Sequence, residues 1–349
     1  MFRHVITYIG MVTAALMTAA CAKTEVSYDT PSEIALAPVV EGMTKAAVAA
    51  GAAPTGQNLV VWANYAEVDA NLTNAEVGDR YFENAVFTDS DSDNIWTGRD
   101  QVYFWPKSGK ITLSGCTELE ARQGTVAYDF TNNKITVDNY KQSLNPSETV
   151  DFLWFNKTDP TNLDRQTDDL ELSLNHALSW VTVKVQGFGG SVGWNIESII
   201  LKNVKDAGDL SCTTAGAEWE NVTVSSGTNE FVVYQAPETG GIKNYFVLTA
   251  DPQNIENTPN GTVLIPQTPV QMEIRYHTTP NPSSSTLRSK TLDLKISDVP
   301  AENLWEAGKH YTYSITFNPY KITFTVDTST SWDGVSIGVD KYVDSEINP

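Results

Sequence analysis

The stretch Lys321-Ile-Thr-Phe-Thr-Val-Asp-Thr-Ser-Thr-Ser-Trp-Asp-Gly-Val-Ser-Ile-Gly-Val339 decides how the fold is interpreted. In each half apolar residues alternate with polar ones, and a segment of Thr, Ser, Asp and Gly separates the halves. Alternation with a period of two is typical of a half-buried strand, so the two halves predict a β-hairpin. The apolar residues of this hairpin are Ile322, Phe324, Val326, Val335, Ile337 and Val339.

The hairpin follows a strand, Tyr311–Phe317, that already resembles the end of a domain. Two interpretations stay open for the extra strands. They complete the domain that precedes them, or they pair with another molecule as a donated strand.

The rest of the chain repeats the same pattern of short strands and turns. Apolar or alternating runs occur at Leu59–Tyr65 and Val150–Phe155, and Val126–Phe130 and Lys134–Val137 flank the pair Asn132-Asn133. Asn tolerates the positive φ that a tight hairpin needs. Helical periodicity is nearly absent, so we expect an all-β chain built of β-sandwiches.

The polar segment 156–169 predicts a boundary between two sandwich domains. The strand pattern that follows, 170–185, is apolar at Leu172 and Leu174 but changes parity by Val181 and Val183. Such a change predicts a β-bulge or a strand that bridges two sheets. The expected divisions are a leader (1–20), a tether, removable strand and loop (21–58), an N-terminal sandwich (59–165, with its first strand at 33–40), a C-terminal sandwich (166–318) and a donor hairpin (319–349).

The composition is that of an acidic globular protein. The 349 residues include 23 Lys and Arg against 43 Asp and Glu, a formal net charge of -20. This balance argues against a nucleic-acid partner, because phosphate binding needs a basic surface. Cys116 and Cys212 form no metal-binding pattern, and we expect them to lie in different domains as buried apolar residues.

The N-terminus predicts export. Arg3 and His4 precede the mostly apolar run Val5–Ala20, which ends in small residues before Cys21. A short apolar run after positive charge is typical of a secretory signal. Thr18-Ala-Ala-Cys21 is similar to a lipobox, which makes Cys21 the expected lipidation site; ordinary cleavage with an unmodified cysteine is the alternative.

The segment after the leader contains one short strand and an Ala/Gly-rich loop. Pro38 limits the strand at 33–40 to a sheet edge or a strand end. Gly51, Pro54 and Gly56 interrupt the loop, which we expect to be exposed and open to proteolysis, with Lys45 at its start.

Several short motifs, taken in order, resemble fimbrillin-like proteins, the lipoprotein-precursor subunits of type V pili. They are the aromatic Trp-Pro strand Gln101–Pro106, the strand Phe152–Phe155, the run Leu172–Val185, and Tyr311–Phe317 followed by Lys321–Val326. The resemblance implies two transthyretin-like Greek-key sandwiches in tandem and a C-terminal hairpin extension.

The family's assembly mechanism is also implied. A trypsin-like protease removes the first strand, and a C-terminal strand of another subunit fills the groove. This predicts a cell-surface fimbrial subunit active in adhesion, lipid-anchored (palmitate) at Cys21 in the outer membrane and incorporated into the fimbrium, with other subunits and a host or bacterial surface ligand as partners. The family's cleaved arginine is missing here, so cleavage between Lys45 and Ala46 is expected for a shaft subunit and no cleavage for an anchor.

Some residues of the sequence also bear on catalysis, calcium binding or glycan binding. No catalytic constellation is visible among the histidines, so we expect no enzyme and no cofactor. The loop Asp89–Asp100 partly mimics a calcium loop but lacks its glycine and final Glu; a solvated acidic loop is the alternative. A lipid-anchored glycan-binding protein is the competing function, because aromatic rings stack on sugars, although we expect Trp62, Trp96, Trp105, Trp154 and Trp180 to pack in the core.

Overall fold

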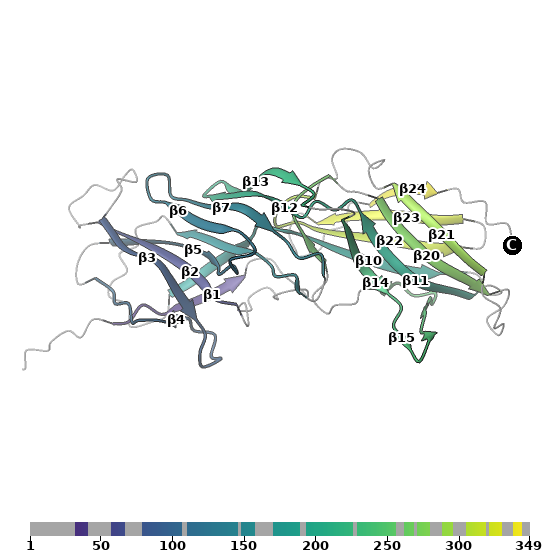
Figure 1. Ribbon diagram of the computed structural model, residues 1–349, viewed down its shortest axis with the longest axis horizontal. Coiled ribbons are helices and arrows are strands. Elements are labelled where there is room, and N and C mark those ends of the chain that lie inside the picture. The colour runs from purple at the N-terminus through teal and green to yellow at the C-terminus, as the bar shows by residue number, and fades with distance from the viewer. Residues whose placement is uncertain are drawn as a thin grey trace, which may run out of the picture. The chain divides into compact units, whose positions relative to one another are not determined.

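The computed structural model describes residues 32–40, 57–66, 79–106, 110–145, 148–157, 170–188, 193–225, 229–255, 262–268, 271–279, 288–295, 305–318, 321–329 and 338–343. Within these ranges the chain forms β-strands and no α-helix, which confirms the all-β prediction (Figure 1). None of the described residues forms a helix with the length and apolar character needed to cross a bilayer. The expected leader, Cys21, Lys45 and Ala46 lie outside the described residues.

Sheet 1 has the strand order β1-β9-β8-β5-β2-β3-β4. Burial alternates along β9, where Leu170, Leu172 and Leu174 are buried and the residues between them are exposed, as expected of a strand with one face on a core. The strands are β1 (Leu36–Val40), β2 (Leu59–Ala66), β3 (Asp79–Thr88), β4 (Thr97–Gly98), β5 (Lys110–Thr117), β8 (Leu153–Lys157) and β9 (Leu170–His176).

Sheet 2 has the order β13-β12-β7-β6. The hairpin predicted around Asn132-Asn133 is confirmed, because β6 pairs antiparallel with β7 and Asn133 has a φ of 48°. The strands are β6 (Thr125–Asp129), β7 (Lys134–Lys141), β12 (Ala207–Thr213) and β13 (Gly216–Thr223).

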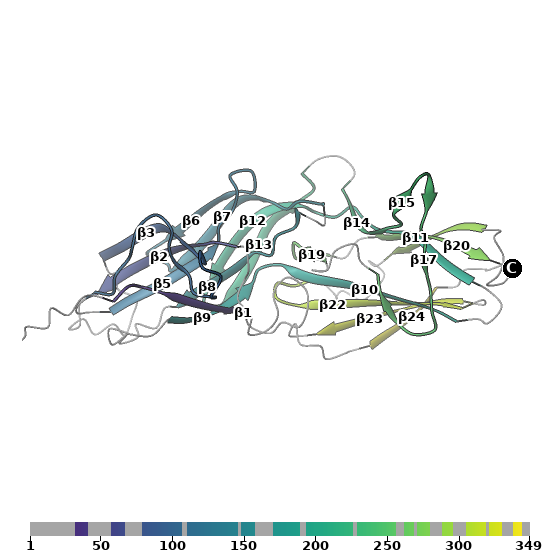
Figure 2. The same cartoon turned by 90° about the horizontal axis from the view of Figure 1, so that it is seen from below.

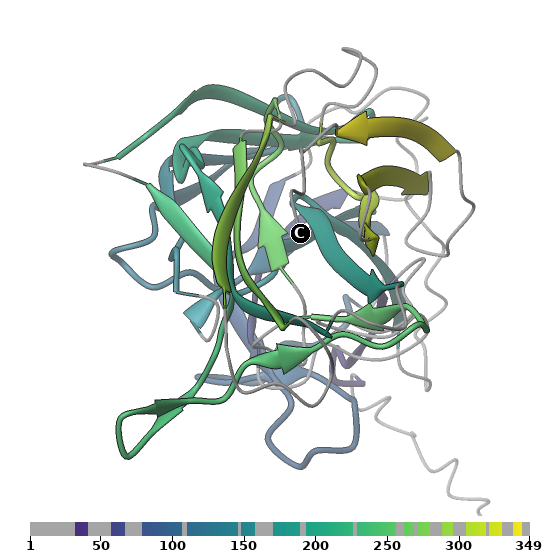
Figure 3. The ribbon, with the colours of Figure 1, turned by 90° about the vertical axis from the view of Figure 1, so that its right-hand side faces the viewer.

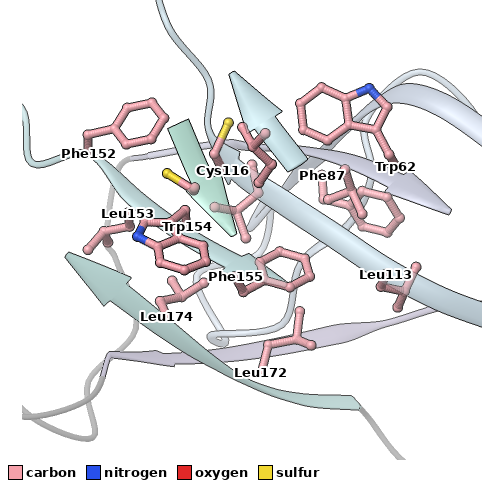
Figure 4. Close-up of a cluster of buried hydrophobic side chains, with 14 of the residues drawn as sticks. Trp62, Phe87, Leu113, Cys116, Phe152, Leu153, Trp154, Phe155, Leu172 and Leu174 are labelled. Carbon is pink, nitrogen blue, oxygen red and sulfur yellow. The ribbon is translucent and has the colours of Figure 1, made fainter. Parts of the chain in front are cut away.

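Apolar side chains of both sheets form one cluster, which we call core 1. Sheet 1 contributes Phe155 of β8 and Leu172 of β9, and sheet 2 contributes Val137 and Leu210. Figure 4 shows the side chains of Leu172 and Leu174 directed toward the same cluster as Phe155 and Cys116. Burial of this apolar surface is the main term that holds the two sheets together.

Sheets 3 and 4 follow the same plan in the second half of the chain. Sheet 3 has the order β18-β10-β22-β23-β24, with β19 also on β10, and sheet 4 has the order β14-β11-β20-β21, with β17 also on β11. β15 and β16 form a separate two-stranded ribbon, of which β15 is labelled in Figure 1. The bounds are β10 (Ser179–Gly187), β11 (Gly193–Lys202), β14 (Glu230–Gln235), β15 (Glu238–Thr239), β16 (Ile242–Lys243), β17 (Phe246–Val247), β18 (Gln253–Asn254), β19 (Thr262–Leu264), β20 (Gln271–Thr279), β21 (Arg288–Lys295), β22 (His310–Asn318), β23 (Lys321–Ser329) and β24 (Gly338–Val343).

A second cluster, core 2, contains side chains of sheets 3 and 4. Val183 and Phe317 come from sheet 3, and Ile196 and Ile274 come from sheet 4. Both cores therefore have the layered arrangement of β-sandwiches. The division into two domains with the expected bounds stays a prediction.

The parity change at 170–185 corresponds to a change of sheet. The chain leaves sheet 1 at His176 and joins sheet 3 at Ser179, so the prediction of a segment that bridges two sheets agrees with the structure. One detail differs from the expectation. β9, which we expected to open the second sandwich, pairs with β8 and β1 and buries its leucines in core 1.

The hairpin β12–β13 also departs from the chain order. Although it follows β11 of sheet 4, it pairs with β7 of sheet 2, with Cys212 opposite Ile135. Asp209 stabilises this contact by accepting hydrogen bonds from the backbone N–H of Asn139 and the side-chain amide of Asn221, both at 2.8 Å. Cys116 and Cys212 consequently lie in the same core, and the prediction that they fall in different domains was wrong.

Candidate functional site

The first strand is bound on both sides by backbone hydrogen bonds. On one side β1 runs parallel to β9, and the N–H of Leu170 donates to the carbonyl of Ala35 at 2.9 Å (Figure 2). On the other side Leu36 and Trp96 exchange two hydrogen bonds, at 2.9 and 2.8 Å. The strand therefore occupies a slot between β9 and the segment that begins at Trp96.

The segment 96–105 also holds the residues just before β1. The N–H of Ile34 donates to the carbonyl of Tyr103 at 2.7 Å, and the N–H of Trp105 donates to the carbonyl of Ser32 at 2.9 Å. We name the segment 96–105 the outer wall of the slot. The expected strand Gln101–Pro106 is thus a short extended segment that makes a single bridge, between Phe104 and Glu33.

Every second side chain of the segment 34–38, which includes the start of β1, is buried, and those of Ile34 and Leu36 belong to core 1. Ile34 and Leu36 are 0% exposed, and Pro38 is also buried. Complete burial of an Ile or Leu side chain stabilises a fold by about 1.5–3 kcal/mol. The strand is therefore an integral part of core 1.

The C-terminal hairpin is paired within its own chain. β23 runs antiparallel to β22, from His310 opposite Ser329 to Asn318 opposite Lys321. β24 then pairs with β23, and the yellow strands lie side by side in Figure 3.

The apolar row of β23 is buried in core 2. Ile322 and Phe324 are members of that core, and the Phe324 ring stacks on Tyr313 with centroids 5.5 Å apart. Val326 is the Cα partner of Val339. The structure thus contains the arrangement in which the hairpin completes its own sheet.

Two apolar rows with the same spacing now stand out. The structure places Ile34 and Leu36 in core 1 and Ile322 and Phe324 in core 2, so it does not bring the two rows together. The side chains of Val326 and Val339, and the residues Val335 and Ile337, lie outside the described part.

The sequence model of the fimbrillin-like proteins matches residues 44–332. This chain belongs to the fimbrillin-like family. Comparison with the sequences of curated proteins gives no match.

Three solved structures are similar to this chain. A fimbrial protein from Bacteroides vulgatus superposes with a TM-score of 0.59 at 14% identity, over 86% of this chain and 100% of that one. A proposed cell adhesion protein from Bacteroides uniformis has a TM-score of 0.45 at 15% identity, over 86% and 99% of the two chains. A fimbrial assembly protein from Parabacteroides distasonis has a TM-score of 0.34 at 13% identity, over 85% and 96%. The first of these supports the β-sandwich fold of the fimbrillin-like chain.

The described histidines of this fimbrillin-like chain pack in separate places. His176 Nδ1 lies 2.6 Å from Asp151 Oδ2, and both side chains are buried. His310 stacks on Trp180 with ring centroids 3.7 Å apart, and burial lowers the pKa of His310 to about 4. His176 and His310 thus each make a local packing or hydrogen-bonding contact, in separate places.

The third histidine belongs to a charged cluster at a bulge in β11. Glu197 accepts a hydrogen bond from Lys243 Nζ and lies 2.7 Å from His277 Nε2. The hydrogen bond from Lys243 is the largest effect that lowers the pKa of Glu197. The cluster connects the β15–β16 ribbon to β11.

In the acidic loop Asp89–Asp100, aspartate side chains accept hydrogen bonds from backbone N–H groups of the same loop. The carboxylate of Asp89 accepts hydrogen bonds from the N–H groups of Asp93 and Asn94, at 3.1 and 3.2 Å. Among the described residues, no group of three or more His, Cys, Asp or Glu side chains is placed to hold a metal ion. The N–H of Ile95 donates to Asp93 Oδ1 at 3.0 Å, which is the hydrogen bond of an Asx turn, so the acidic side chains of the loop bind its own backbone.

The tryptophans weighed for glycan binding are buried. Trp62, Trp96, Trp105, Trp154 and Trp180 all belong to core 1. Their burial agrees with the expectation that these tryptophans pack in the core.

Sequence reasoning missed the outer wall. Its residues face alternately inward and outward, with Tyr103 and Trp105 turned to the protein and Val102 and Phe104 exposed. The alternation of aromatic and apolar residues was visible in the sequence. Its partner, the segment that starts at Ser32, could not be read from it.

Proposed function

We propose that this chain is a structural subunit of a cell-surface fimbria that assembles by exchange of β-strands and contributes to adhesion. As a precursor it is exported and anchored in the outer membrane by lipid on Cys21. Proteolysis between Lys45 and Ala46 frees the first strand, and a C-terminal strand of a second copy or a related subunit takes its place. The role has no catalytic step.

One observation carries this proposal. The first strand buries Ile34, Leu36 and Pro38 at two-residue spacing, the first two in core 1, and β23 has Ile322, Phe324 and Val326 at the same spacing. Strand addition needs this match, because the backbone supplies the hydrogen bonds and alternate side chains fill the pockets.

The free-energy cost of removing the first strand from its slot explains why its release needs a trigger. Loss of the first strand exposes the apolar slot and leaves the N–H of Leu170 and Trp96 without their partners, at a cost of about 1–3 kcal/mol for each buried group. In the intact chain the loop keeps the strand at a high effective concentration beside its slot, which disfavours exchange. A cut in the loop removes this advantage, and the donated strand restores the same contacts.

Cleavage after Lys45 decides which position a copy takes in the fimbria. A cleaved copy can both donate and accept, as a shaft subunit requires. An uncleaved copy keeps its first strand and its lipid, so it can donate but not accept, as an anchor requires.

Limited trypsin digestion tests the proposal. We expect a new N-terminus at Ala46, followed by ladders of oligomers on native gels. Lys45→Ala should keep the protein monomeric. An N-terminus at Ala46 without any ladder would refute the exchange.

A matched pair of variants tests the donor. Ile322→Asp should abolish the ladder, whereas Thr323→Asp, on the half-buried opposite face of β23, should not. Because Ile322 also packs in core 2, a synthetic peptide of residues 321–329 provides the second measurement. The peptide should bind the chain that has been cleaved after Lys45 and not the uncleaved chain. Equal binding to both would contradict the proposal.

A further inference from the structure

An exposed apolar group lies at the start of the slot. Tyr81 is 38% exposed, Val102 is 50% exposed and Phe104 is 44% exposed. They adjoin one another, because Tyr81 Oη donates a hydrogen bond to the carbonyl of Phe104 at 2.6 Å and Val102 lies two residues before Phe104. We name these three residues the mouth patch.

The mouth patch belongs to the same wall that holds the first strand. Val102 and Phe104 alternate with Tyr103 and Trp105, whose backbone groups bind Ile34 and Ser32. A strand that enters the slot in the direction of β1 must therefore pass the patch first.

A second exposed apolar pair lies beside the end of β22. The N–H of Phe188 donates to the carbonyl of Phe317 at 2.7 Å, and Phe188 is 43% exposed. Val247 is 62% exposed, and its neighbour Leu248 lies against Gly187. We name Phe188 and Val247 the hinge patch, because Phe317 is the next-to-last residue of β22, from which the chain continues to β23.

The direction of the donated strand brings the two patches together. β1 runs parallel to β9, and a slip by one residue would turn the apolar row away from core 1. We therefore place the donated β23 parallel to the acceptor's β9, with its apolar row facing core 1. In this register Ile322 takes the position of Ile34 and Phe324 that of Leu36. Only two residues then separate Lys321 from Asn318, the last residue of β22.

The three residue steps from Asn318 to Lys321 span at most about 10 Å of extended chain. The end of the donor's β22 must therefore lie close to the acceptor's Phe104, within reach of aromatic side chains from both copies. Charge attraction does not explain such a contact, because each copy carries a formal net charge of -20. Exposed apolar patches at both places supply the attraction that like-charged copies need.

We propose that the mouth patch of one copy docks on the hinge patch of the next, as a second interface beside the donated strand. The occupant of each patch is a second copy of this chain. This inference rests on the proposed strand exchange and adds that β23, not β24, is the donated strand. Donation of β24 would insert a long tether and would not bring the patches together.

Engineered cysteines test the contact in the mature chain with Cys21→Ser. Val102→Cys combined with Phe188→Cys should give disulfide-linked multimers on oxidation, and only after cleavage at Lys45. Val102→Cys combined with Val224→Cys is the matched control, because Val224 is 42% exposed, like Phe188, but follows β13 of sheet 2.

The outcomes separate this inference from the exchange itself. Non-covalent ladders without disulfide-linked multimers would overturn the docking and leave the exchange intact. Equal cross-linking in the control pair would also overturn it. The absence of any ladder would overturn both.

A charge at the patch gives a second measurement. Phe104→Asp should slow ladder formation by about tenfold, as truncation of an interface aromatic commonly does, while Val224→Asp should not. Since the Phe104 side chain is exposed, the variant should fold, and binding of the 321–329 peptide should persist. Unchanged ladder kinetics in Phe104→Asp would contradict the proposed docking.

Discussion

Leu36→Ala perturbs the first strand at the point where it is most completely enclosed. Leu36 is 0% exposed, and its backbone exchanges two hydrogen bonds with Trp96, so the surroundings have little freedom to collapse into the space. A Leu→Ala change in such a place costs about 2–5 kcal/mol. We expect the free energy needed to detach the first strand from its slot to fall by this amount, while the stability of sheets 3 and 4 does not change.

Amide hydrogen exchange measures this opening directly. The N–H of Leu170 donates to Ala35 and the N–H of Trp96 donates to Leu36, so both amides report on the strand. At tenfold per 1.4 kcal/mol, the expected loss of protection is roughly 30-fold to several thousand-fold, where the strand opens locally.

Glu33→Ala is the control on the same segment, because Glu33 is exposed. It should leave the protection of both amides within a factor of a few. Unchanged protection in Leu36→Ala, with the chain folded, would refute the view that the first strand is held by its apolar row.

Three further predictions follow from the pKa shifts. Burial raises the pKa of Cys116 and of Cys212, so neither thiol should react with iodoacetamide at pH 8 until urea unfolds the chain, as intact mass will show. The pKa of Glu197 is lowered chiefly by the hydrogen bond from Lys243. The ionised Glu197 therefore stabilises the fold above its unfolded-state pKa of 4.5, and this stabilisation is lost as the pH falls through the lower folded-state pKa. Glu197→Gln should reduce the fall in melting temperature over this acidic pH range. Burial lowers the pKa of His310 from 6.5 to about 4, so its NMR shifts should not titrate between pH 8 and 5, and its protonation in the unfolded state should favour unfolding increasingly below pH 6.5.

The predictions that succeeded were about residues whose environment is local. Asn132-Asn133 gave the β6–β7 hairpin because a tight turn depends on a few adjacent dihedral angles. The parity change within 170–185 revealed a change of sheet, because a strand can bury only the side chains on its inner face.

The failures concern pairing between distant strands. β9 was placed with the strands that follow it, but its hydrogen bonds go to β8 and β1. The hairpin β12–β13 returns to β7, which brings Cys212 into the core that holds Cys116. An alternating pattern shows that a strand has an inner face but not which sheet it joins.

The sequence by itself determined an all-β chain, a short first strand at 33–40, the apolar row at Ile322–Val326, and through its motifs the fimbrillin-like family. Only the tertiary structure decided that the first strand buries Ile34 and Leu36 in a slot between β9 and the outer wall, and that β23 completes sheet 3. The physical reason is that strand pairing is made by backbone groups that every residue carries, so the choice of partner depends on the packing of whole sheets.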